Sequence, residues 1–200
     1  MNVLTADDID FSLYEQETDA QQKVLPASLY LQDFVERLKA PHPTPMPCLP
    51  WRKTHGKVAF RPGEVTLWAG ANGSGKSLVT GQVCMSLLAQ NQKVCIASFE
   101  MKPQKTLERM ARQYTGFDGE FLRNNHPQEL PAFFALIEDM RVCTSDLWLY
   151  DQQGTVKAEK LFAVIRFCAQ ELGVQHFVVD SLMKCVAGDD DYNLQKELTD

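Results

Sequence analysis

The chain has 200 residues, 44% of them hydrophobic, and a formal net charge of −6. This length and composition are typical of one globular domain with or without a tail, and no apolar run reaches the about 18 residues that a membrane span needs. The negative charge argues against a protein that binds nucleic acid over its whole surface.

Residues 1–25 are polar and acidic, and the first 20 positions contain six carboxylates and no lysine or arginine. A segment of this kind has too little apolar surface to build a core of its own. We therefore expect an acidic tail that is disordered or loosely packed. Because the rest of the chain is neutral, the net negative charge of the protein comes from this tail.

Residues 26–50 predict an amphipathic helix followed by a proline-rich linker. Apolar residues recur at i, i+3, i+4 and i+7, which places them in one stripe along the helix: Leu31, Phe34, Val35 and Leu38. Five prolines between residues 41 and 50 remove backbone donors and fix φ. We expect an extended linker there, which tethers the helix to a domain at 51–200.

From residue 51 onward, apolar runs that suit buried strands alternate with segments of helical periodicity. We expect strands at 64–69, 93–99, 147–151 and 176–180. We expect helices at 76–90, 105–115, 127–140 and 156–172. This alternation predicts an α/β fold with a mostly parallel sheet that helices cover on both faces.

The sequence GANGSGKS at residues 70–77 fits the pattern G-x-x-x-x-G-K-[ST] at every fixed position. An expected strand enters this loop and an expected helix leaves it, as a P-loop (Walker A motif) requires. Its N–H groups would point at phosphates, the lysine would reach the β- and γ-phosphates, and the serine hydroxyl would bind Mg²⁺. The candidate phosphate-binding residues are Gly70, Ala71, Asn72, Gly73, Ser74, Gly75, Lys76, Ser77 and Leu78.

Two carboxylates follow expected strands. Asp180 ends the run HFVVD, and Glu100 follows the run VCIASF. Because the carboxyl ends of parallel strands meet at the edge where ligands bind, both should face the P-loop. Asp180 is the candidate Mg²⁺ ligand beside Ser77, and Glu100 is the candidate base that polarises the attacking water. The alternatives are that Asp180 closes a turn and that Glu100 caps the next helix.

Together these motifs resemble the RecA-type motor domain of DnaB- and Twinkle-like hexameric replicative helicases, P-loop AAA-family ATPases of the phage and prophage type. The typical segments are GEVTLWAGANGSGKS, ASFEM with the helix that contains LERMARQ, and HFVVDSL. The likeness covers about residues 50–185 and implies a RecA-like fold. It implies that Lys76 and Ser77 hold ATP phosphate and Mg²⁺, that Glu100 is the catalytic base, and that Asp180 is the Walker B acid.

The resemblance also implies partners. Such helicases act on single-stranded DNA as homo-hexamers, and the helix within residues 26–50 is similar to the linker helix that docks on a neighbouring subunit. Packing of this helix on its own domain stays the alternative. A primase or a loader is left open as a further partner, although no primase-type zinc ribbon precedes the motor in this sequence.

Family members continue well past the Walker B strand, where they carry a γ-phosphate sensor, DNA-binding loops and an arginine finger. We therefore expect residues 51–200 to be the N-terminal part of the motor, incomplete at its C-terminus. Such a part would bind ATP without unwinding DNA. Two other functions stay open: a RecA-like ATPase of recombination or regulation that moves no DNA, and a catalytically silent nucleotide-binding fragment. The ASFEM segment and the lack of an arginine-rich lid disfavour a small-molecule kinase.

The remaining polar residues predict no further site. We expect the acidic residues 188–193 to form a solvated loop, and the basic residues after Glu100 to form a solvated helical face: Lys102, Lys105, Arg109 and Arg112. The six cysteines stand singly, which predicts reduced thiols in a cytoplasmic protein without disulfides or zinc.

Overall fold

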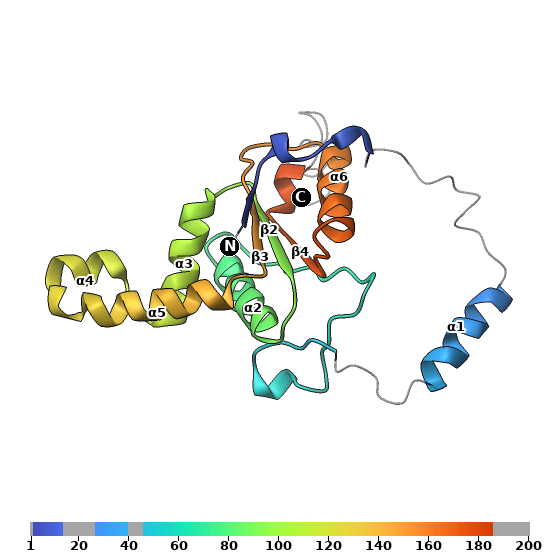
Figure 1. The fold of residues 1–200 in the computed structure, drawn as a ribbon, viewed down its shortest axis with the longest axis horizontal. Coiled ribbons are helices and arrows are strands. Elements are labelled where there is room, and N and C mark those ends of the chain that lie inside the picture. Colours follow the sequence, from blue (N-terminus) through green and yellow to red (C-terminus); the bar gives the residue numbers. More distant parts are fainter. Residues whose placement is uncertain (1, 14–26, 40–45, 186–200) are drawn as a thin grey trace.

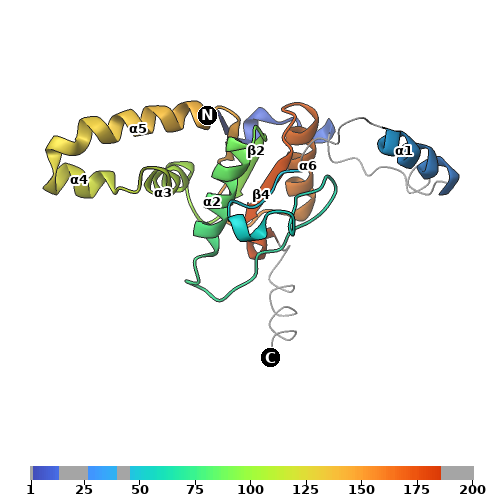
Figure 2. The same cartoon turned by 90° about the horizontal axis from the view of Figure 1, so that it is seen from below.

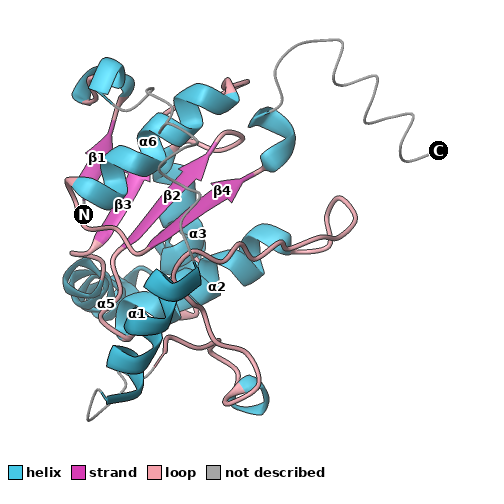
Figure 3. Ribbon diagram, turned by 90° about the vertical axis from the view of Figure 1, so that its right-hand side faces the viewer, coloured by secondary structure: helices cyan, strands magenta, loops and turns pink. Residues whose placement is uncertain are grey.

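Four parallel strands form the central sheet of the computed structural model, which describes residues 2–13, 27–39 and 46–185. Their order across the sheet is β1-β3-β2-β4 (Figure 3). The strands are β1 (Asn2–Leu4), β2 (Val94–Ser98), β3 (Leu147–Tyr150) and β4 (His176–Asp180). All three strand pairs are parallel, which confirms the sheet type that the sequence predicts.

Helices cover both faces of this sheet (Figure 1). Successive residues of a strand point to opposite faces, so Val94 and Ile96 pack into one apolar cluster and Cys95 and Ala97 into the other. The first cluster includes residues of α2 (Lys76–Ala89), α3 (Pro103–Thr115) and α5 (Leu130–Cys143), and the second includes α6 (Ala158–Gln170). Burial on both faces explains why the two central strands, β2 and β3, are apolar at nearly every position. The α/β fold class, a parallel sheet flanked by helices as in the RecA-like fold that the resemblance implies, is thereby confirmed.

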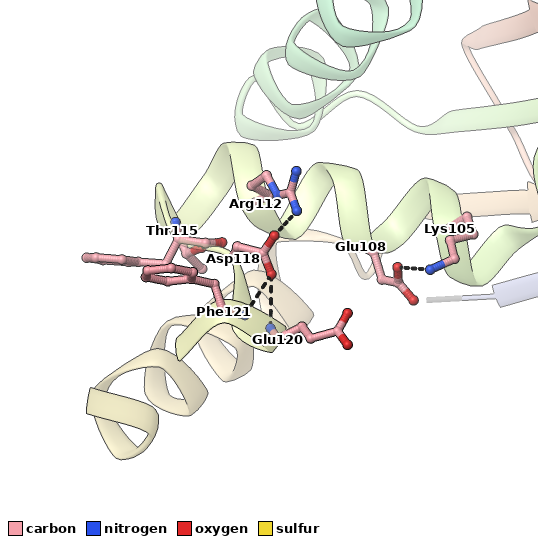
Figure 4. A network of polar contacts seen from close by, with 8 residues as sticks. Lys105, Glu108, Arg112, Thr115, Asp118, Glu120 and Phe121 are labelled. Carbon is pink, nitrogen blue, oxygen red and sulfur yellow. Dashed lines mark hydrogen bonds and ion pairs between the residues drawn. The ribbon is translucent and has the colours of Figure 1, made fainter. Parts of the chain in front are cut away.

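Helices α3, α4 (Gly119–Asn125) and α5 form an arm that extends away from the sheet (Figure 2). A short helix, η5 (Pro127–Glu129), leads into α5. The sequence analysis missed α4, which begins where the Asp118 carboxylate accepts hydrogen bonds from the N–H groups of Glu120 and Phe121, at 3.0 and 3.2 Å. The bond from Phe121 is the largest of the effects that hold the pKa of Asp118 below its usual value. Asp118 also pairs with Arg112 of α3, which joins the two helices (Figure 4).

The expectation of a disordered or loosely packed tail is wrong for residues 2–13. β1 pairs with β3 at the edge of the sheet, and η1 (Ala6–Asp8) and η2 (Phe11–Leu13) follow it. Leu4 and Ile9 are only 8% and 5% exposed, within the apolar cluster beside α6. These few apolar residues dock on a surface that β3 and α6 provide, so the acidic composition around them did not predict their packing. Residues 14–25 lie outside the described part of the chain.

The strand expected at residues 64–69 is also wrong. This segment has no regular secondary structure, and Val65 and Leu67 are 94% and 73% exposed. A strand is stable only where neighbouring strands take up its backbone hydrogen bonds. None of the four described strands pairs with this segment, so its apolar alternation alone does not make it a strand.

Helix α1 (Ala27–Lys39) forms where the sequence predicts it and lies apart from the sheet (Figures 1 and 2). Its four stripe residues are between 42% and 69% exposed. The end of the expected linker packs on the domain, since Cys48 bridges to Ala59 and Leu49 is buried. The helix η4 (Arg52–Thr54) comes next, and η6 (Leu182–Cys185) ends the described chain.

Two further expectations concern membrane-spanning segments and the acidic residues near the C-terminal end of the sequence. Among the helices of the described ranges, none is long and apolar enough to span a membrane. The acidic residues 188–193 lie outside those ranges, so the expectation of a solvated loop stays a prediction.

Candidate functional site

The P-loop residues form an open turn that leads into α2. Gly73 and Gly75 have φ angles of 76° and 87°, a backbone conformation that costs other residues about 1–2 kcal/mol. Gly75 is the residue directly before the first turn of α2, which starts at Lys76. Residues 70–74 are exposed. The free N–H groups of the helix start therefore open towards solvent, the arrangement that binds phosphate groups.

The Lys76 side chain folds back over this turn. Its Nζ atom donates to the carbonyl oxygens of Gly70 and Ala71, at 2.8 and 3.0 Å. The ammonium group thus lies beside the loop that the sequence assigns to phosphate. An incoming phosphate would replace two neutral carbonyl acceptors with charged oxygens, which form stronger hydrogen bonds to an ammonium group.

Ser77 and Asp180 line one small crevice of about 30 Å³ between α2, β2, α3 and β4. Ser98 and Thr106 line it too, and both are buried. The Oγ1 atom of Thr106 is buried without a hydrogen-bond partner. The crevice therefore offers a hydroxyl and a carboxylate oxygen, which are the ligand types that Mg²⁺ prefers. These residues fit a magnesium ion.

Glu100 and Asp180 lie at the ends of neighbouring strands. Ser98 of β2 lies opposite Asp180 of β4 in the sheet register, and the Phe99 N–H donates to the Asp180 carbonyl at 2.7 Å. Glu100 is exposed two residues beyond β2. The structure thus brings both carboxylates to one edge of the sheet, as the sequence analysis expects, and Asp180 shares its crevice with the P-loop serine.

Ser181 is a residue of this site that the sequence analysis missed. It follows Asp180 directly, and its hydroxyl donates to the Glu100 Oε1 atom at 2.9 Å. The available signal was a hydroxyl residue next to a carboxylate at a strand end. That signal is too common to identify a site without the strand register.

The basic residues of α3 divide between two surroundings. Lys105 pairs with Glu108 at 2.6 Å and Arg112 pairs with Asp118, all on the exposed surface of the arm (Figure 4). Arg109 instead lines the crevice that contains Asp180. Arg109 is nevertheless exposed, as are Lys102, Lys105 and Arg112, so the solvated face expected for these residues is confirmed.

A groove of about 980 Å³ lies between α3 and α5, beside α4. Charged residues from all three helices stand along it, including the two ion pairs of Figure 4. Its apolar lining residues are Leu107, Ala111, Phe117, Leu130, Phe133, Phe134, Ile137 and Met140. The exposed fraction of Phe134 is 60%, so the groove presents apolar surface to solvent.

The cysteines form no metal site in the described part of the chain. Four of the six are buried, and all are free thiols. The described residues contain no cluster of histidine, cysteine and carboxylate side chains able to hold a metal ion.

The sequence was compared with models of known protein families. The sequence model for the DnaB-like helicase C terminal domain matches residues 53–200. The chain belongs to this family. The DnaB-like domain includes the P-loop, Glu100 and Asp180, whereas β1 and α1 precede the matched residues. The resemblance to DnaB-like helicases is thereby confirmed. The comparison with curated proteins finds no match.

Proposed function

We propose that this chain is the ATP-hydrolysing motor of a replicative DNA helicase that acts on single-stranded DNA as a ring. One observation carries the proposal: Ser77 of the P-loop shares a crevice with Asp180 at the carboxyl edge of a parallel sheet, where Glu100 follows the neighbouring strand. Family membership supports the motor type. The geometry supports a site that hydrolyses a nucleotide, because Ser77 and Asp180 line one crevice and the exposed Glu100 carboxylate lies at the end of the strand beside Asp180.

In this proposal the P-loop amide groups and Lys76 bind the phosphates of ATP. Ser77 and Asp180 would hold Mg²⁺, which offsets the negative charge on the β- and γ-phosphate oxygens. Glu100 accepts a proton from water as the water oxygen bonds to the γ-phosphorus and the bond to the bridging oxygen of ADP breaks. The exposed position of Glu100 suits this role, since water reaches its carboxylate directly.

We also propose that α1 joins neighbouring copies of the chain. Its exposed stripe of Leu31, Phe34, Val35 and Leu38 needs an apolar partner, because a helix of this kind gains most of its stability by burying that face. The groove between α3 and α5 is lined by exposed apolar side chains that could pack against this stripe. Docking of α1 in the groove of the next copy would build the homo-hexameric ring that the resemblance implies. A primase or loader would be a further partner of that ring.

Two alternatives have different chemistry. A RecA-like ATPase of recombination or regulation would hydrolyse ATP without moving along DNA. A silent nucleotide-binding protein would bind ATP and not hydrolyse it. The irregular structure of residues 64–69 favours this alternative, because a strand entering the P-loop would hold the loop more firmly.

ATP hydrolysis by the protein expressed from its complete reading frame, with and without single-stranded DNA, tests the proposal. We expect turnover that single-stranded DNA stimulates. Turnover that is independent of DNA would favour the recombination or regulatory ATPase. ATP binding without turnover in either condition would favour the silent protein.

A further inference from the structure

Ser181 and Glu100 are 81 positions apart in the sequence and in contact in the structure. The serine hydroxyl donates to the Oε1 atom of the carboxylate at 2.9 Å. The parallel pairing of β2 with β4 brings them together, because Ser98 and Asp180 are partners in the register. Each contact residue follows the end of its strand by one or two positions.

Both backbones are fixed where these side chains meet. On the Glu100 side, the buried Ser98 hydroxyl accepts a hydrogen bond from the Met101 N–H at 3.2 Å, which closes the turn around Glu100. Phe99, the residue before Glu100, is 2% exposed and anchors this turn in the core. The turn therefore holds the Cα atom of Glu100 in place, but the turn alone does not fix the rotamer of the exposed side chain.

On the other side, the Ser181 carbonyl accepts a hydrogen bond from the Lys184 N–H at 3.1 Å, within the turn that becomes η6. The Lys184 carbonyl in turn accepts from the Val156 N–H at 2.8 Å, and Cys185 is buried. A serine directly before a helix often uses its side chain to cap the first turn. Such a cap uses the hydroxyl oxygen as an acceptor, so the hydroxyl hydrogen of Ser181 is available for Glu100, to which it is donated.

We propose that Ser181 is a positioning residue for Glu100. The proposal rests on the function proposed above, in which Glu100 takes the proton of the attacking water. A hydroxyl donor on Oε1 fixes the plane of the carboxylate and leaves Oε2 able to accept that proton. Without the donor, an exposed glutamate with three rotatable bonds samples several rotamers, and only a fraction of them point at the water.

Replacing Ser181 with alanine tests this role through kinetics. We expect Ser181→Ala to lower kcat about tenfold, part of the about 10²–10⁴-fold that a general base contributes. We expect KM, ATP affinity and the Mg²⁺ concentration for half-maximal activity to stay within about twofold, since none of these depends on the orientation of the base. Ser181→Thr keeps the hydroxyl and should recover most of the lost kcat.

The outcomes separate this proposal from the proposed function. Glu100→Gln is the reference variant and should lose turnover while it still binds ATP. If it keeps turnover, the role of Glu100 is wrong. If Glu100→Gln is inactive but Ser181→Ala keeps its kcat within about twofold of the unmodified protein, the hydrolytic site stands and the positioning role is wrong. An equal loss in Ser181→Ala and Ser181→Thr, with lower thermal stability in both, would also overturn it, because it would indicate a structural role.

A crystal structure of the Ser181→Ala variant gives a readout that needs no turnover. We expect the Glu100 carboxylate to leave its present orientation or to occupy several rotamers. An unchanged, single orientation would overturn the proposal.

Discussion

At the scale of single residues, nucleotide binding requires exchange of partners in the P-loop. Lys76 now donates to the carbonyl groups of Gly70 and Ala71, and it would release them to reach phosphate oxygens. Asp180 needs no comparable movement, because it already lines the crevice with Ser77. The two residues proposed to bind Mg²⁺, Ser77 and Asp180, therefore need less rearrangement than Lys76, and the effect of Mg²⁺ on ATP affinity should depend on Asp180.

We predict that Asp180→Asn removes most of the effect of Mg²⁺ on ATP affinity. Loss of a residue that only supports a metal ligand costs about 10–100-fold in metal affinity, so loss of a direct ligand should reach the upper end of that range. Titration of ATP with and without Mg²⁺, followed by fluorescence or calorimetry, measures the difference. Asp151→Asn is the matched control, because Asp151 is an exposed carboxylate directly after β3. Equal Mg²⁺ dependence in both variants would contradict the assignment.

The sequence predicts the positions of the motif residues well and their mutual contacts less well. Lys76 and Ser77 are fixed by spacing within one loop, and Asp180 by its place after an apolar run. Ser181 could not be assigned in this way, since its contact with Glu100 depends on the register of β2 against β4. A register between strands far apart in the chain has no local signature in the sequence.

At the scale of secondary structure elements, too, the sequence predicts what depends on local pattern and misses what depends on contacts between distant segments. β2 and β3 are predicted because every residue in them is buried, β4 because its short run is mostly apolar, and α6 because its apolar residues repeat with helical period. β1 was missed because three residues in an acidic segment form a strand only on the edge that β3 offers. The strand at 64–69 was predicted wrongly because alternating apolar residues do not form a strand unless a neighbouring strand takes up their backbone hydrogen bonds.

Docking of the N-terminal segment predicts a clear effect on stability. Ile9→Ala should lower the free energy of unfolding by about 2–5 kcal/mol, because Ile9 is only 5% exposed in the cluster beside α6. Val3→Ala should change it by about 0.5 kcal/mol or less, because Val3 is 44% exposed on the same segment. Urea unfolding followed by tryptophan fluorescence measures both. Equal values for the two variants would show that residues 2–13 do not pack as described.

At the scale of the whole molecule, α1 and the groove between α3 and α5 are two apolar surfaces that the described residues expose to solvent. We predict that Phe34→Asp abolishes ring assembly, because it places a charge in the apolar stripe. Sedimentation in the presence of ATP and Mg²⁺ should give a ring-sized oligomer for the unmodified protein and smaller species for the variant. Glu36→Ala, about 200° around the same helix from Phe34, should leave the ring intact. A ring that survives Phe34→Asp would exclude α1 as the connecting element.

The most direct test of the central claim, that this chain is a DNA-dependent ATP motor, is the steady-state rate of ATP hydrolysis in the presence of single-stranded DNA. The comparison is between the protein from its complete reading frame and its Lys76→Ala variant, with Lys105→Ala as the surface lysine control. We predict turnover that DNA stimulates, that Lys105→Ala retains, and that Lys76→Ala loses. Turnover that Lys76→Ala retains, or that does not respond to DNA, would contradict the account.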